Sequence, residues 1–300
     1  MKLELININK SFSNKKILKD ISFTINSGKA MGFLGRNGAG KTTTIRIIMD
    51  VFKADSGSIT INDKPFLKKD YKIGYLPEEK GMYQKIPLLK QLVYFGELKG
   101  LSKKEAIEKG TEIINKMGLS EYLNKPLSML SKGNQQKFFI AQSIINDPDI
   151  LILDEPFGGL DPVNAQSLKD IIRDYIKKDK IVIFSSHQMS HVEEFCDDVT
   201  FIKDGKIVLS DNLNKLKKEM GKNKIKIKLI EDNEVEKLNI IKDILIKKEN
   251  DYIIIECLNN KKTNDLLLEI LNLKLNIEEF SNYVPNLETI FIKIEGDKNE

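Results

Sequence analysis

The residues best suited to chemistry lie in one glycine-rich segment, Gly35-Arg36-Asn37-Gly38-Ala39-Gly40-Lys41-Thr42. Its spacing matches a phosphate-binding loop, in which glycines let backbone N–H groups approach phosphate oxygens without an intervening Cβ. In such a loop Lys41 reaches the β- and γ-phosphates, and the hydroxyl of Thr42 ligates Mg²⁺. The sequence therefore predicts a nucleotide site that contains Gly35, Asn37, Gly38, Gly40, Lys41, Thr42 and Thr43.

The flanks of this loop favour the same interpretation. Ala30 to Leu34 form an apolar run typical of a buried strand, and Thr43 to Ile48 have the pattern of a helix. A strand, a loop and a helix in this order are the context that a phosphate-binding loop requires. The alternative, a glycine-rich turn with a solvated lysine, does not explain these flanks.

Two acids follow a second apolar run. Residues 150–153 are Ile-Leu-Ile-Leu, and Asp154 and Glu155 come directly after them. A continuous apolar run indicates a fully buried parallel strand, and open α/β sheets bind ligands at the carboxyl ends of such strands. The sequence therefore predicts that both carboxylates lie at the ligand-binding edge, although an ordinary strand end would have the same composition.

Two domains are expected. Strands alternate with helices over residues 30–185, which predicts an α/β fold with a mostly parallel, helix-covered sheet. Residues 3–8 and 17–25 read as N-terminal strands with a turn at residues 14–16, and residues 80–145 read as a helical subdomain. The pattern changes near residue 220, so we expect a first domain at 1–220 and a small α+β domain at 221–300.

Composition limits the class of protein. The chain has 300 residues, of which 41% are hydrophobic and 31% charged, and no apolar run approaches the length of a membrane span. The start of the chain does not resemble a signal peptide, and the two cysteines, Cys196 and Cys257, suit a reducing compartment. We therefore expect a cytoplasmic protein. The net charge of +4 is spread without long basic blocks, so nucleic-acid binding is not expected.

Five motifs in a fixed order carry a family resemblance. They are the loop at 35–42, the helix start Leu130-Ser131-Lys132-Gly133-Asn134, the strand end Leu153-Asp154-Glu155-Pro156, and the segments Gly158-Gly159-Leu160-Asp161 and Ser185-Ser186-His187. Over about residues 1–215 the chain resembles the ATP-binding subunit of an ATP-binding-cassette (ABC) transporter. The resemblance implies the fold of a P-loop ABC ATPase cassette, with a mixed sheet, N-terminal antiparallel strands and a helical subdomain.

The resemblance also implies a mechanism. Two cassettes, as a homodimer or a heterodimer, sandwich two ATP molecules, and each phosphate-binding loop faces Ser131, Gly133 and Asn134 of the partner cassette. Asp154 matches the Mg²⁺-binding acid, Glu155 the general base and His187 the γ-phosphate switch. Asp161 matches a residue that crosses the dimer interface. Phe12, which spacing alone would assign to the core, matches the residue that stacks on adenine.

The chain departs from the family at two places. Glu78 or Glu79 follows the strand at 73–76 where the family usually has Gln, and we expect Glu78 to fill that position near the metal. Lys132 and Asn134 replace Gly and Gln in the segment that starts the helix at 131. The backbone donors remain, but the shorter Asn side chain changes the expected contacts with the partner's ATP.

The resemblance implies a function in transport. An Mg²⁺-dependent ATPase would drive separate transmembrane permease subunits and lie peripherally on the cytoplasmic face of the membrane. Residues 221–300 resemble the extension found on sodium-efflux and drug- or peptide-export ATPases, which favours export of an ion, drug or peptide. The main alternative is an ABC ATPase that acts on ribosomes or DNA, but the chain has neither a second cassette nor a long coiled-coil insertion.

A zinc site is a further alternative. His187 and His191 are four residues apart, and Cys196 is nearby. Gln188 stands where the zinc-peptidase pattern requires Glu, and no fourth ligand lies at a suitable spacing. The sequence therefore favours the nucleotide role of His187.

Overall fold

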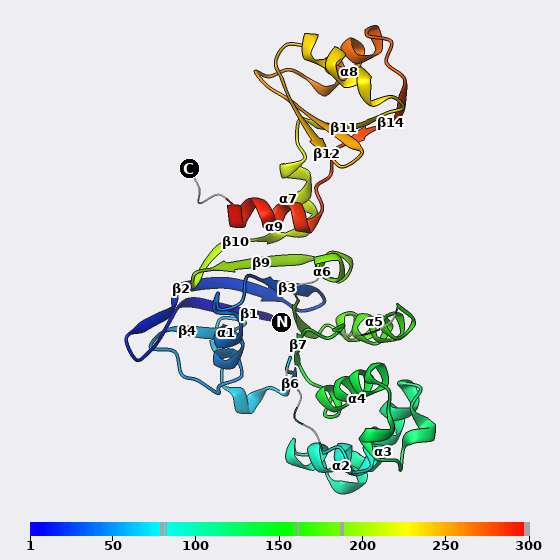
Figure 1. The fold of residues 1–300 in the computed structure, drawn as a ribbon. Helices are drawn as coiled ribbons and strands as arrows, with labels where there is room; N and C mark the ends of the chain where they lie inside the picture. Colours follow the sequence, from blue (N-terminus) through cyan, green and yellow to red (C-terminus); the bar gives the residue numbers. More distant parts are fainter. Residues whose placement is uncertain (79–80, 82, 159, 161, 187–188, 297–300) are drawn as a thin grey trace. The chain divides into compact units, whose positions relative to one another are not determined.

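The computed structural model describes residues 1–78, 81, 83–158, 160, 162–186 and 189–296 (Figure 1). They divide into two compact units, Met1–Leu213 and Asn214–Glu300, and each is treated on its own below. The units separate where helix α7 (Leu213–Met220) begins, whereas the change in sequence pattern that suggested residue 220 comes where this helix ends.

An antiparallel sheet forms one part of the first unit. Its strand order is β2-β1-β4-β5, with β1 at Lys2–Phe12, β2 at Lys15–Asn26, β4 at Ser56–Ile61 and β5 at Lys64–Pro65. The turn between β1 and β2 is Ser13-Asn14, one residue earlier than the sequence suggested. Ser13 has a φ of 51°, so the chain reverses there and Phe12 pairs with Lys15.

A six-stranded mixed sheet carries the predicted phosphate-binding loop and the two acids. Its order is β10-β9-β3-β8-β7-β6, and only the contact of β10 (Lys206–Asn212) with β9 (Asp198–Lys203) is antiparallel. The strands β3 (Ala30–Leu34), β7 (Ile150–Asp154) and β8 (Ile181–Ser185) are buried throughout, as their apolar runs predict, while β6 (Ile73–Leu76) forms the other edge. The predicted α/β cassette fold is confirmed.

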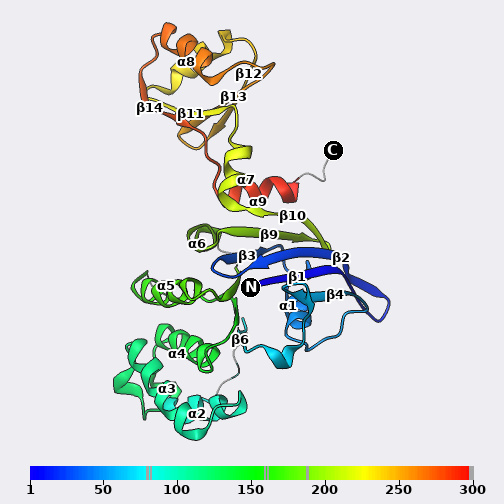
Figure 2. The same ribbon diagram turned by 180° about the vertical axis from the view of Figure 1, so that it is seen from behind.

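Helices complete the first unit. Helix α1 (Lys41–Ile48) follows β3, while α5 (Pro162–Lys177) and α6 (Met189–Phe195) follow β7 and β8. Beyond β6, the helices α2 (Leu88–Leu98), α3 (Lys103–Lys116) and α4 (Lys132–Ile144) gather beside the sheet (Figures 1 and 2). Ser102 and Glu105 form a reciprocal capping box that fixes the start of α3. Short 3₁₀ turns lie at Lys68–Asp70, Ser120–Tyr122 and Leu127–Met129.

The second unit is a split βαβ module. Its order along the chain is β11 (Lys224–Leu229), the 3₁₀ run Asp232–Ile240, β12 (Ile244–Glu249), β13 (Tyr252–Cys257), α8 (Thr263–Asn272) and β14 (Ile277–Asn282). The strands pair antiparallel in the order β12-β13-β11-β14, as in ferredoxin-like folds. One sheet face packs on α8 through Ile225, Ile227, Ile255 and Leu266. Helix α9 (Leu287–Gly296) follows β14. In the described part of the chain, no helix has both the length and the hydropathy to cross a bilayer.

A tight turn ties the phosphate-binding loop to both sheets of the first unit. Asp204 and Gly205 join β9 to β10, and Gly205 has a φ of 77°. Its N–H donates to the Ala39 carbonyl at 3.0 Å, and its carbonyl accepts from the Lys19 N–H at 2.7 Å. A Cβ at position 205 would lie 2.0 Å from the Ile17 carbonyl oxygen. Only glycine therefore lets this turn reach Ala39.

We predict that Gly205→Ala lowers the free energy of unfolding by about 2 to 4 kcal/mol, because strain at positive φ adds to a backbone clash. Gly118 is a matched control, since its φ is 69° but nothing lies within 4 Å of an added Cβ. Gly118→Ala should cost only about 1 kcal/mol. Denaturant unfolding of both variants checks this, and equal losses would contradict the role of the clash.

Candidate active site

A cavity of about 610 Å³ lies where strands β3, β6, β7 and β8 of the six-stranded sheet end. Each of these strands contributes to the wall through its last residue or through the loop that follows it. Ten residues predicted from the sequence line it together: Phe12, Asn37, Gly38, Gly40, Lys41, Thr42, Thr43, Glu78, Asp154 and Glu155. The site predicted at the carboxyl edge of the sheet thus forms one connected space.

The loop delivers backbone donors and a lysine to this space. Gly40 caps α1 with a φ of 116°, and a Cβ there would lie 2.7 Å from Leu18 Cδ2, so glycine is required. No side chain caps this helix and no acid lies in its first turn. The helix N-terminus therefore keeps the partial positive charge that attracts phosphate. Gly35 contributes its carbonyl to the loop instead of lining the cavity.

Lys41 is folded back onto the loop. Its Nζ donates to the carbonyls of Gly35 at 2.6 Å and Arg36 at 3.2 Å. Burial lowers the pKa of Lys41, while the charges of Asp154, Glu155 and Glu78 oppose this shift. The Lys41 ammonium is partly desolvated, and three carboxylates lie near it. It is therefore suited to bind an anion that brings a cation with it, because that cation can interact with the carboxylates.

Asp154 supplies a buried carboxylate at the end of β7. It is 7% exposed, and the Ser185 hydroxyl donates to its Oδ1 at 2.7 Å. Burial raises the pKa of Asp154, and the nearby charges of Glu78 and Glu155 raise it further. A divalent cation would remove this repulsion. Thr42 adds a hydroxyl to the same cavity, and a donor set made of oxygens suits Mg²⁺.

Glu155 stands in an unusual backbone conformation. Its φ is 49°, a left-handed value that costs a residue with a Cβ some free energy. Its N–H donates to the Ser185 carbonyl at 2.9 Å, and the Ser186 hydroxyl donates to its Oε2 at 3.0 Å. These contacts fix the carboxylate beside Lys41, where it can act on a water near a bound phosphate.

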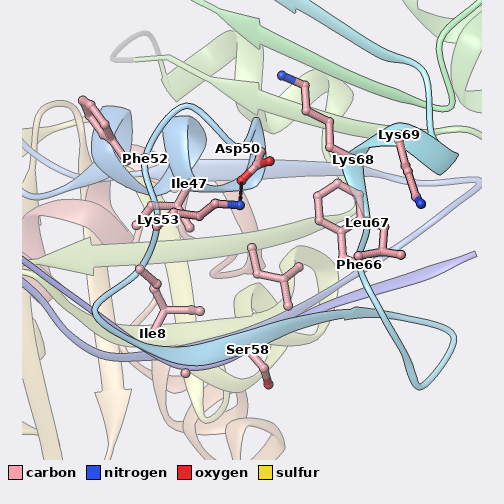
Figure 3. A pocket seen from close by; sticks show the side chains of 13 residues that line it. Ile8, Ile47, Asp50, Phe52, Lys53, Ser58, Phe66, Leu67, Lys68 and Lys69 are labelled. Atoms are coloured by element: carbon pink, nitrogen blue, oxygen red, sulfur yellow. Dashed lines mark hydrogen bonds and ion pairs between the residues drawn. The ribbon is translucent and has the colours of Figure 1, made fainter.

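Phe12 is at the mouth of the cavity and is 40% exposed, which disfavours the alternative that it is a core residue. Its ring contacts Phe52 edge to face, with centroids 5.2 Å apart. Phe52 belongs to the wall of a separate hollow of about 410 Å³ with Ile8, Ile47 and Phe66 (Figure 3). Phe52 therefore packs against the Phe12 ring from outside the cavity.

The predicted partner-facing residues lie elsewhere. Ser131 is the N-cap of α4, and its exposed hydroxyl accepts the Asn134 N–H at 3.3 Å. Neither these two residues nor Gly133 line the cavity. His187 and Asp161 lie outside the described residues, so their predicted roles stay predictions.

The sequence analysis missed three residues that line the cavity, namely Lys15, Ile17 and Ser185. Lys15 pairs with Phe12 in the β1–β2 register and adds a positive charge to the wall of the cavity. Ser185 holds Asp154, and Ser186 holds Glu155. The sequence places both hydroxyls at the end of a buried strand, but only the structure shows that this strand lies next to the one that carries both acids.

The zinc alternative draws no support from Cys196. This side chain is buried, and burial raises the pKa of its thiol well above the usual value. Among the described residues, no group of three or more His, Cys, Asp or Glu side chains is placed to hold a metal ion. The ring of His191 packs on Phe157 with centroids 4.7 Å apart.

Comparisons with known proteins agree with this geometry. Residues 18–158 match the family described as ABC transporter, and residues 212–294 match the family described as ATP-binding protein DrrA1-3-like, C-terminal domain. The uncharacterized ABC transporter ATP-binding protein YhaQ of Bacillus subtilis (strain 168) is 36% identical over 98% of both chains. The ABC transporter ATP-binding protein NatA of the same organism is 34% identical and covers 71% of this chain and 91% of its own.

A solved structure described as an ATP-binding subunit of an ABC transporter superposes with a TM-score of 0.66. It is 26% identical and covers 74% of this chain and 94% of its own. The relative that spans nearly the whole chain and the matched cassette fold lead to one conclusion. The chain belongs to the family of ABC transporter ATP-binding proteins.

Proposed function

We propose that the chain hydrolyses ATP with Mg²⁺ at two composite sites of a cassette dimer and thereby drives export through separate membrane subunits. Hydrolysis of ATP is general to ABC cassettes, and ATP-binding subunits of this family generally pair with transmembrane permease components. One observation carries the assignment of the site. Lys41, Asp154, Glu155 and Phe12 line a single cavity at the carboxyl edge of the sheet.

Each side chain has a distinct proposed role. Phe12 stacks on the adenine, and Lys41 exchanges its loop carbonyls for phosphate oxygens. Thr42 and Asp154 hold Mg²⁺, which when bound neutralises charge on the phosphates. Glu155 orients the attacking water and accepts its proton, while Ser186 fixes one of its oxygens. His187 contacts the γ-phosphate.

A second cassette completes each site in this proposal. Ser131, Gly133 and Asn134 lie at the N-terminus of α4 and outside their own chain's cavity. Such a helix end is suited to hold the γ-phosphate of a nucleotide that is bound to another subunit. The dimer is therefore formed with another copy of the chain or with a paralogue, and Asp161 crosses the interface.

Relatives support an export role. Linearmycin resistance ATP-binding protein LnrL of Bacillus subtilis (strain 168) is 29% identical over 98% of both chains. Lantibiotic transport ATP-binding protein SrtF of Streptococcus pyogenes is 34% identical over 71% of this chain. We assign an ion, drug or peptide cargo, with the chain held at the cytoplasmic face by its permease. Residues 78–96 form the proposed coupling surface, where Tyr83 and Tyr94 are each at least half exposed.

The second unit, residues 214–300, is proposed as an accessory or regulatory module. Its match to the DrrA-like C-terminal family over residues 212–294 supports this, and its own core makes it able to fold as a unit. We do not assign it any part in the chemical step, because all the residues of the proposed catalytic cavity belong to the first unit.

Glu155→Gln should lower kcat for ATP about 10²- to 10⁴-fold, because the general base is lost. ATP binding should persist, and the variant should accumulate as an ATP-bound dimer on size-exclusion chromatography. Purified from native membranes with ATP, it should retain a protein with several apolar spans. Copurification of ribosomes or DNA without such a protein would contradict the transport role.

Glu78→Gln should raise the Mg²⁺ concentration for half-maximal ATPase activity roughly threefold to tenfold, because one negative charge near the metal is removed. Glu97→Gln is the control, since Glu97 is an exposed acid on α2 away from the cavity. A magnesium titration of ATPase activity checks both variants. If Glu78→Gln behaves like the control, Glu78 does not occupy the metal-proximal position.

Phe12→Ala should raise the Kd for ATP roughly tenfold through loss of stacking, and Phe52→Leu roughly threefold through loss of the supporting ring. Phe66→Leu is the matched control. Phe66 lines the same hollow as Phe52 (Figure 3) but contacts Tyr71, with ring centroids 5.7 Å apart. Equilibrium binding of a fluorescent ATP analogue measures all three, and equal effects of the Phe52 and Phe66 changes would refute the supporting role.

A further inference from the structure

Gln136 joins helix α4 to the segment that carries the proposed general base. Its side chain is 3% exposed, and its Nε2 donates to the Pro156 carbonyl at 2.5 Å. Pro156 directly follows Glu155 in the chain. One short hydrogen bond therefore links the helix that presents Ser131 to the backbone that presents Glu155.

A side chain is required for this link. The left-handed φ of Glu155 turns the chain, and the Pro156 carbonyl accepts from α4. Gln136 lies beyond the first four positions of α4, in the part where the backbone N–H groups are occupied by the helix itself, so at this point the helix offers a donor through a side chain. An apolar residue at position 136 would fill the space but leave a buried carbonyl without this donor, which is costly.

The segment after Glu155 is anchored on its other side as well. Phe157 is 3% exposed and packs against Phe184 and Phe195, with ring centroids 5.5 Å and 5.3 Å away. Lys99 holds the far end of α4, because its Nζ donates to the carbonyls of Gln142 at 3.1 Å and Ser143 at 3.3 Å. Between these anchors, a displacement of the N-terminal half of α4 reaches Glu155 through Gln136.

We infer that Gln136 is a positioning residue that transmits the engagement of Ser131 with the partner's nucleotide to Glu155 in its own site. The inference rests on the composite-dimer site proposed above. Its consequence is that hydrolysis in one site depends on whether the other site is closed. Gln136 does not line the cavity, so its loss should affect the chemical step and leave nucleotide affinity unchanged.

The test is Gln136→Met, which keeps an unbranched side chain of similar length and removes the donor. Gln142→Met on the same helix is the matched control, because Gln142 contributes only its backbone carbonyl to the contacts above. We expect kcat for ATP to fall roughly tenfold in Gln136→Met, as for one lost buried hydrogen bond, with KM within twofold of the parent. The control should keep both constants.

A second measurement separates positioning from packing. In the Glu155→Gln background, adding Gln136→Met should leave the ATP concentration that drives dimerisation within about threefold, because Ser131 and the loop at 35–42 are intact. Dimerisation lost in parallel with kcat would overturn the inference and reduce Gln136 to a packing residue of α4. An unchanged kcat would overturn it directly. Failure of Glu155→Gln alone to dimerise with ATP would refute the composite site, and kcat of Gln136→Met would still decide whether Gln136 positions Glu155.

Discussion

The candidate site depends on three carboxylates that lie close together at the carboxyl edge of the six-stranded sheet. Asp154, Glu155 and Glu78 line one cavity together with the cations of Lys41 and Lys15, and the pKa of Asp154 is raised by burial and by its two acidic neighbours. This arrangement is unfavourable by itself, because partly desolvated carboxylates repel one another. A nucleotide that arrived with a divalent cation would balance this repulsion. The charges of the cavity therefore suit a ligand that carries both positive and negative charge, and they do not stabilise the protein without that ligand.

The elements around the cavity hold these charged groups in place. Parallel strands bring the ends of β7 and β8 together, so that Ser185 and Ser186 each hold one of the two acids. The left-handed backbone of Glu155 is tolerated because the N–H of Glu155 and its carboxylate both have partners. At the other wall, the Gly205 turn reaches Ala39 and fixes the loop that carries Lys41. Strain at the site is therefore compensated by contacts that come from distant parts of the sequence.

Much of the fold could be predicted from local sequence signals. Apolar runs predicted β3, β7 and β8, and the glycine spacing predicted the loop before α1. The turn after β1 was placed one residue late, because a left-handed serine at position 13 has no strong sequence signature. Lys15, Phe52 and Ser185 were missed for a different reason. Their roles depend on which strands become neighbours, and strand order is a tertiary property that local patterns do not encode.

The chain carries one set of motifs, and these motifs lie at two separate places in the first unit. Its cavity contains the loop and the acids, whereas Ser131 begins a helix that lies outside that cavity. In the proposed dimer, each site is divided between two cassettes. Such a site is useful only if the state of one half affects the other half, because hydrolysis before closure would not be coupled to transport. A buried hydrogen bond has a preferred distance and angle, so it resists relative movement of the two groups that it joins. The bond from Gln136 to the Pro156 carbonyl joins the helix that begins after Ser131 to the residue that follows Glu155, which are the two groups that the proposed dimer mechanism must couple.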